Sequence, residues 1–212
     1  DRYYRMALQA RIDGGYATHP LTAFQYMSAA LNLSAGGRSA EALALLDQAP
    51  AFAAARGEGA AHSSRYADLV AYARARTLLD AGRPGEALAV LPAAMLAPGE
   101  DRVSRYDAQV ALALRGEARC ALKQPREGLA DLRQSLALAT QTRDDPLDTD
   151  LARLHAVTGS CALALGDAAT ARAEAERARR AFQALPGASD YRQAPLRRLD
   201  AALSIQAARM GR

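Results

Sequence analysis

Hydrophobic and polar positions follow each other along this chain with the period of amphipathic helices, and short polar turns interrupt that period at regular places. Four similar segments each join a Gly- or Pro-containing turn to an Ala- and Leu-rich stretch; they begin at residues 35, 81, 122 and 165 and read AGGRSAEALALL, AGRPGEALAVL, LKQPREGLADL and LGDAATARAEA. Apolar residues three and four positions apart lie on one face of a helix. The pattern therefore predicts an all-α protein built from repeated helix hairpins.

Small residues recur at three fixed places in each repeat. The first helix carries one of them, and the second helix carries two more, twelve and nineteen residues later. The four sets are Ala30, Ala42 and Ala49; Ala75, Ala87 and Ala94; Gly116, Gly128 and Ser135; and Gly159, Ala171 and Ala178. Successive sets are 41 to 45 residues apart. Small side chains let two helices approach closely and then stack on the next pair.

The turns inside the repeats carry residues that end and begin helices. Gly ends the first helix in most repeats, and Ser, Pro or Asp begins the second, in agreement with capping preferences. Looser stretches rich in turn formers separate the repeats. The expected units are 21–62, 63–101, 102–147 and 148–189, with a closing helix in 190–212 and the remnant of an earlier unit in 1–12.

The spacing of the small residues around a Gly-containing turn resembles the tetratricopeptide repeat, from Leu21 to Leu185. The resemblance implies a right-handed α-solenoid of about four repeats in a single domain. These units are longer than the usual length of about 34 residues, and their length overlaps that of HEAT-type repeats. The chain also resembles, more loosely, the helical-repeat regions that follow kinase or DNA-binding domains in large bacterial regulatory proteins. Its start in mid-helix at Asp1 favours a piece of a longer polypeptide.

Composition narrows the classes of protein that fit. The chain is 50% hydrophobic but only 5% aromatic, without Trp, which favours closely packed helices of Ala and Leu over a sheet. Every basic residue except Lys123 is Arg, as is typical of GC-rich bacterial genomes. The sequence has no apolar run long enough to span a membrane. The cytoplasm is the favoured compartment, with the periplasm as the alternative if a membrane segment lies upstream.

The net charge of +4 is concentrated at the C-terminal end of the chain. Residues 172–212 carry nine Arg against four acidic residues. Arg172, Glu176 and Arg180 stand four positions apart, which indicates a solvated helix that caps a solenoid. We therefore expect no nucleic-acid partner, and contact with an acidic partner or neighbouring domain is the alternative.

No pattern in the sequence indicates catalysis, a cofactor or a metal site. The three histidines, His19, His62 and His155, lie far apart and are interpreted as ordinary surface or half-buried residues. The acidic segment 144–150 lacks the central Gly and the distal Glu of an EF-hand and is interpreted as a helix cap. Cys120 and Cys161 differ by two positions within their repeats, about 200° of helix, so we expect them on different faces, with neither a disulfide nor zinc.

In a tetratricopeptide-like stack, the resemblance implies that the first helices line a concave groove. The candidate partner-binding residues on that face are Met27, Leu31, Tyr72, Arg76, Glu117, Arg153 and Ser160. The charged members are favoured because a charge that faces inward needs a partner. We expect Tyr72, Arg76 and Glu117 to converge on one region. The Lys and Asn clamp of family members that bind chaperone tails has no counterpart here, which disfavours that class of partner.

These patterns predict a non-catalytic interaction module that binds a protein or peptide in the groove, as part of a larger bacterial regulatory protein. Two alternatives stay open. One is a ligand-sensing domain that holds a small molecule or short peptide in the groove. The other is a self-association module that forms a homodimer.

Overall fold

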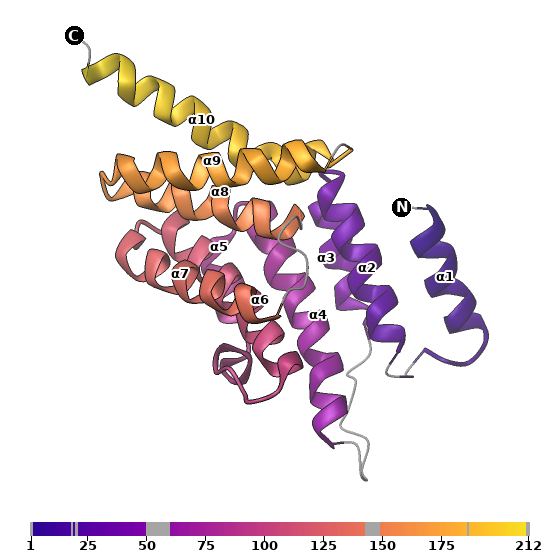
Figure 1. The fold of residues 1–212 in the computed structure, drawn as a ribbon. Coiled ribbons are helices and arrows are strands. Elements are labelled where there is room, and N and C mark those ends of the chain that lie inside the picture. Colours follow the sequence, from indigo (N-terminus) through magenta and orange to yellow (C-terminus); the bar gives the residue numbers. More distant parts are fainter. Residues whose placement is uncertain are drawn as a thin grey trace. The chain divides into compact units, whose positions relative to one another are not determined.

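The computed structural model describes residues 2–17, 19, 21–49, 60–142, 149–185 and 187–210. Within these residues the chain forms ten α-helices and one short 3-10 helix, with no strand (Figure 1), which confirms the all-α prediction. The helices belong to two compact units, Asp1–Ala93 and Ala94–Arg212, called unit 1 and unit 2 below. A single right-handed solenoid of the tetratricopeptide type stays a prediction.

Unit 1 is assembled around its second and fourth helices. Its helices are α1 (Arg2–Asp13), α2 (Thr22–Ala35), α3 (Ser39–Asp47), α4 (Ala60–Asp80) and α5 (Pro84–Ala89). Helix α2 packs on α1, α3 and α4, while α5 packs on α4. The buried cluster between them is small and mostly Ala and Leu; it contains Ala30, Leu33, Ala42, Leu46 and Ala73.

The second helix of the second repeat is much shorter than expected. Helix α5 ends at Ala89, and the chain continues into a 3-10 helix at Ala93–Leu96. Pro92 stands three residues after the last residue of the helix. Proline lacks an N–H group, and its ring disfavours helical backbone in the residue before it. Pro92 therefore disfavours a continuation of α5 through Leu91.

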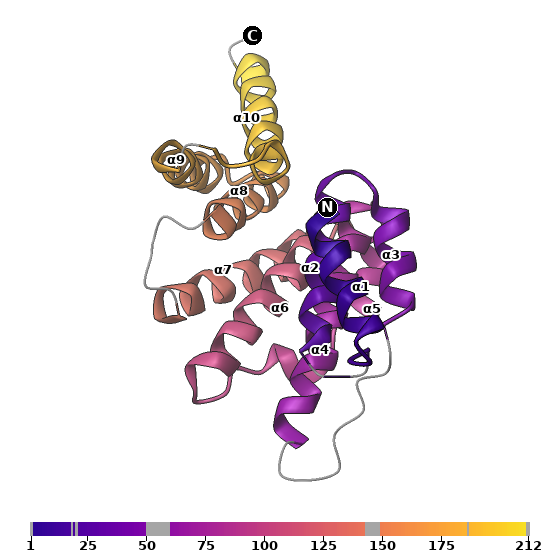
Figure 2. The same ribbon diagram turned by 90° about the vertical axis from the view of Figure 1, so that its right-hand side faces the viewer.

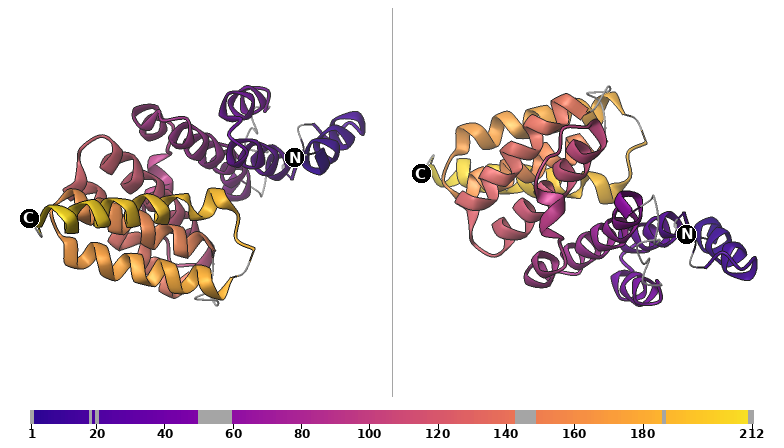
Figure 3. Two further views of the ribbon diagram at one scale, coloured as in Figure 1. Left: turned by 90° about the horizontal axis from the view of Figure 1, so that it is seen from above. Right: turned by 90° about the horizontal axis from the view of Figure 1, so that it is seen from below.

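Unit 2 contains the two longest and best-formed hairpins and a closing helix. Its helices are α6 (Arg102–Ala121), α7 (Pro125–Thr142), α8 (Thr149–Ala164), α9 (Ala168–Ala184) and α10 (Asp190–Met210). Helix α6 packs on α7, α7 on α8 and α8 on α9, and α10 packs on both α8 and α9 (Figures 2 and 3). Helix α10 lies within the segment 190–212, where the sequence predicts a closing helix. None of the helices in the described part of the chain is both long enough and apolar enough for a membrane span.

The predicted small residues stand where the paired helices touch. A Cβ atom added to Gly116 of α6 would lie 2.8 Å from the carbonyl oxygen of Gly128 in α7, and one added to Gly128 would lie 2.8 Å from that of Gly116. In the next hairpin, a Cβ atom on Gly159 would lie 3.1 Å from the carbonyl oxygen of Ala171. No side chain separates these backbones, which confirms the predicted close approach.

All four predicted hairpin turns share one geometry. The residue with positive φ after each first helix is Gly37, Gly82, Lys123 or Gly166. The N–H group of the next residue then donates to the carbonyl oxygen five residues back, at 2.8 to 3.0 Å: Arg38 to Leu33, Arg83 to Leu78, Gln124 to Arg119 and Asp167 to Ala162. This pairing is the Schellman motif that commonly ends helices. Lys123, with φ of 64°, is the only residue other than glycine with positive φ in the described part of the chain.

Candidate functional site

The two apolar candidates of unit 1 contribute to its core. Met27 and Leu31 lie on α2, are half-buried and pack against the buried cluster of this unit. Both side chains therefore stabilise unit 1, and only their remaining exposed atoms are available to a partner.

Arg76 of α4 forms an ion pair inside unit 1. Its Nε atom lies 3.3 Å from Oδ1 of Asp80, one turn further along the helix. The other carboxylate oxygen of Asp80 accepts a hydrogen bond from the Ser34 hydroxyl of α2, at 2.8 Å. Only 9% of Arg76 is exposed, so its charge is balanced within the fold. Tyr72, one turn before Arg76, is half-buried.

Three alternate helices of unit 2, α6, α8 and α10, each contribute a residue to the contacts of Arg153. Arg153 of α8 donates through Nη2 to Oε1 of Glu117 on α6, at 3.1 Å. Its guanidinium carbon also lies 5.2 Å from the ring centroid of Tyr191 on α10, within the range of a cation–π interaction. We call Glu117, Arg153 and Tyr191 the Arg153 row. Ser160 is exposed on α8, two turns beyond Arg153.

The structure thus brings together two of the predicted residues, Glu117 and Arg153, and adds a third that sequence reasoning missed. Tyr191 was missed because the closing helix has no second helix after it, so its register within the repeat could not be assigned. Tyr72 and Arg76 belong to unit 1, and their convergence with Glu117 stays a prediction.

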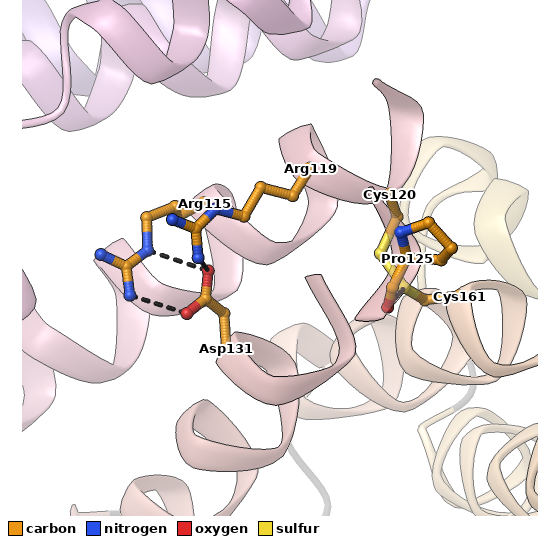
Figure 4. A network of polar contacts seen from close by, with 6 residues as sticks. All are labelled: Arg115, Arg119, Cys120, Pro125, Asp131 and Cys161. Atoms are coloured by element: carbon orange, nitrogen blue, oxygen red, sulfur yellow. Dashed lines mark hydrogen bonds and ion pairs between the residues drawn. A yellow bond between two sulfur atoms is a disulfide. The ribbon is translucent and has the colours of Figure 1, made fainter. Parts of the chain in front are cut away.

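A second polar cluster joins α6 to α7 (Figure 4). Asp131 of α7 is 5% exposed and accepts hydrogen bonds from Arg115 Nε at 2.8 Å, Arg115 Nη2 at 2.7 Å and Arg119 Nη1 at 2.7 Å. We call these three residues the basic cluster. The sequence contains a signal for it, since Arg115 and Arg119 stand four positions apart and therefore lie on one face of the helix.

Cys120 of α6 and Cys161 of α8 form a disulfide, with their Cα atoms 5.7 Å apart, so the prediction of no disulfide is wrong. The first helix of each hairpin contacts the preceding first helix with one side and the following first helix with its opposite side. Residues that point in opposite directions within their own repeats are therefore the ones that meet. The offset of about 200°, which we took to separate the two sulfur atoms, is what brings them together. The Cys161 sulfur also lies 3.3 Å from the carbonyl oxygen of Pro125.

A third cluster, between α8 and α9, contains His155. The Nδ1 atom of His155 lies 2.6 Å from Oε2 of Glu174, and Arg177 pairs with the other carboxylate oxygen. Burial raises the pKa of Glu174, but the hydrogen bond and charge of His155, together with Arg177, outweigh burial and hold that pKa below its usual value. His155 itself is half-buried, in agreement with its interpretation from the sequence.

Most of the acidic segment 144–150 lies outside the described residues, including Asp144, Asp145 and Asp148. The side chain of His62 also lies outside them. Asp150 is described: it pairs with Arg192 of α10, which also donates to the Thr149 hydroxyl at 2.7 Å. Within the described ranges, no three His, Cys, Asp or Glu side chains gather in the way a metal ion requires.

Comparison with known proteins adds no relative: no family model, curated protein or solved structure matches this chain.

Proposed function

We propose that the chain is a non-catalytic module that binds an extended protein or peptide segment at the Arg153 row. The observation that supports this proposal is the position of Arg153, which contacts a carboxylate from the preceding first helix and an aromatic ring from the following one. Arginine and tyrosine are the residue types that most often dominate binding surfaces.

The chemistry of the row suits a peptide. Glu117 can accept hydrogen bonds from peptide N–H groups, Tyr191 offers an aromatic face, and Arg153 can donate to carbonyl oxygens. A stack held together by apolar contacts alone would not need this ion pair, since a well-packed apolar replacement is often equally stable. The exposed hydroxyl of Ser160 would extend the same surface along α8.

Binding without catalysis fits the other polar clusters as well. In the basic cluster, Arg115 and Asp131 pair across two helices, and in the cluster around His155 the imidazole of His155 contacts the carboxylate of Glu174 across two helices. Such pairs hold helices in register and recognise polar partners, whereas an activated nucleophile needs a base beside a hydroxyl, thiol or amine. We also propose that this module is part of a larger bacterial regulatory protein.

The disulfide between Cys120 and Cys161 supports an oxidising compartment, because such bonds are rare where glutathione and thioredoxin keep thiols reduced. We therefore propose the periplasm or the cell exterior over the cytoplasm. Alkylation of free thiols in intact cells, followed by mass spectrometry of the chain, would test this. Alkylation of both cysteines in the native host would contradict it.

A selection from a random peptide library, carried out with the oxidised chain, tests the binding function directly. The informative variant is the double substitution Glu117→Gln and Arg153→Gln, which replaces both members of the ion pair by neutral amides. Arg172→Gln, on the exposed face of α9, is the matched control.

We expect selected peptides to bind the double variant roughly tenfold more weakly or worse, as for a hot-spot residue, and the control normally, in titration calorimetry. Circular dichroism should be the same for all three proteins. If no peptide is selected, or if every selected peptide binds the double variant as well as the original chain, the proposal is wrong.

A further inference from the structure

We infer that the basic cluster of unit 2 is a second binding site, which takes a carboxylate group of an acidic peptide. Arg115 and Arg119 lie one turn apart on α6 and converge on Asp131 of α7 (Figure 4). Two positive charges therefore share a single negative charge. The cluster as a whole carries one net positive charge.

The two guanidinium groups keep most of their hydrogen-bonding capacity. Each carries five N–H donors, and Asp131 takes two from Arg115 and one from Arg119. Within the described residues, neither arginine has a buried nitrogen atom that lacks a hydrogen bond. The remaining donors therefore reach solvent, in agreement with side-chain exposures of 25% for Arg115 and 29% for Arg119.

The site is already organised before a ligand binds. Asp131 is buried and orients both guanidinium groups, so little side-chain entropy is lost when they bind an anion. The backbone around them is also held in place. Gly116 and Gly128 bring α6 and α7 into direct contact, and Cys120, the residue after Arg119, is covalently joined to α8.

Helix packing alone does not require the second arginine. Arg115 already forms two parallel hydrogen bonds to Asp131, which is the strongest geometry available to an Arg and carboxylate pair. Arg119 adds a second positive charge beside the first, and like charges repel at this separation. A carboxylate from a partner would bring the cluster to neutrality and fit the planar donors of a guanidinium.

The size of the charge indicates the class of partner. One net positive charge matches one carboxylate, whereas a nucleic acid presents a charge at every nucleotide and is bound by a wide basic surface. Arg115 and Arg119 each stand two residues from Glu117, about 200° around the helix. The cluster therefore faces another side of α6 than the Arg153 row, and the two sites can be tested separately.

Fluorescence anisotropy with a labelled octaglutamate peptide tests the inference on the oxidised full chain. An octaglutamine peptide and an oligothymidylate of equal charge serve as comparison probes. The informative variant is Arg119→Gln, because Arg115 still pairs with Asp131 in it. Arg172→Gln removes the same charge from an exposed position on α9 and is the matched control.

We expect octaglutamate to bind more tightly than octaglutamine, and Arg119→Gln to weaken that binding about tenfold, the size of a lost charge-assisted hydrogen bond. Arg172→Gln should change it little. Added salt should weaken it, since the site is partly exposed. Arg119→Lys, which keeps the charge but not the planar donors, should bind several-fold more weakly than the original chain.

Three results would overturn the inference. Equal losses in Arg119→Gln and Arg172→Gln would assign the binding to general positive charge. Tighter binding of oligothymidylate that depends on Arg119 would assign the site to nucleic acid. If the Gln variant fails to fold, unchanged binding in Arg119→Lys would show that the guanidinium donors are not used. None of these results depends on whether the Arg153 row binds a peptide.

Discussion

Cys120 at the end of α6 and Cys161 in α8 are joined by a disulfide that spans 41 residues of sequence and encloses the whole of α7. The bond ties together the first helices of two neighbouring hairpins. It lies beside the contact between Gly116 and Gly128, so a covalent link and a direct backbone contact reinforce the same part of unit 2.

Reduction of this disulfide should lower the free energy of unfolding by roughly 2 to 4 kcal/mol, because the unfolded chain regains the entropy of a loop of this length. Urea denaturation with and without a thiol reductant measures the difference. The double variant Cys120→Ser and Cys161→Ser should match the reduced protein and show no response to reductant. A reductant effect that persists in this variant would contradict the assignment.

Gly128→Ala should destabilise unit 2 by about 1 to 3 kcal/mol, the usual cost of overpacking. The added methyl group would lie 2.8 Å from the Gly116 carbonyl oxygen and 3.0 Å from the Cys120 amide nitrogen, and would collide with the Cys120 sulfur. Gly85→Ala in α5 is the control: apart from its chain neighbours and the backbone of its own helix, no atom lies within 4 Å of the new methyl group, and the helix should gain about 0.5 to 1 kcal/mol. Thermal denaturation compares the two.

Lys123→Gly should stabilise the protein, by up to about 1 kcal/mol. Lys123 has φ of 64° in the turn between α6 and α7. This left-handed conformation costs a residue with a Cβ atom roughly 1 to 2 kcal/mol. Glycine avoids that cost, but part of the gain is offset because glycine loses more backbone entropy on folding. The reverse change, Gly82→Ala, should destabilise the corresponding turn of unit 1, where φ is 73° and no neighbour obstructs a methyl group. Denaturation midpoints that move in the same direction for both variants would refute this explanation.

Acid should remove the stabilisation that Glu174 provides. Its pKa in the folded state lies below the usual value near 4.5, so its contribution is complete above that pH and is lost as the pH falls through the lowered pKa. Urea denaturation between about pH 6 and pH 3 should show a weaker pH dependence for Glu174→Gln than for the original chain. Equal pH dependence would mean that Glu174 has an ordinary pKa.

Arg76→Gln should cost about 3 kcal/mol of stability, since it removes a cation that pairs with the buried carboxylate of Asp80. Only 11% of the Arg76 side chain and 9% of the Asp80 side chain are exposed. Arg83→Gln is the matched control, because Arg83 pairs with Glu86 at the surface and exposed pairs contribute little. If both variants unfold at the same urea concentration, the ion pair of Arg76 does not stabilise unit 1, and a role of Arg76 in binding a partner is favoured instead.

Local features of the sequence predicted the all-α class and the hairpin turns of the fold. Helix periods, small residues at fixed spacing and turn residues all act over a few positions, and the four hairpin turns are where these signals placed them. The short α5 is the exception: the repeat pattern predicts a longer second helix, whereas Pro92 disfavours helical backbone in the residue before it.

The candidate site was predicted less well, because it depends on which faces of distant helices meet. Glu117 and Arg153 were selected one at a time, and nothing local indicates that a pair 36 positions apart is in contact. Asp131 was not selected at all, since its partners lie on the preceding helix. The two cysteines show the same difficulty. Their offset of about 200° is correct, but it brings the two sulfur atoms together because α6 and α8 contact each other through opposite sides.

The disulfide also determines how far the protein extends when it is pulled. In a chain stretched from its two ends, the segment between Cys120 and Cys161 stays closed, and the force passes across a Cα separation of 5.7 Å. Reduction would release roughly 140 Å of contour length, at about 3.5 Å for each residue. Oxidation therefore shortens the reach of this chain as a tether and shields α7 from tension.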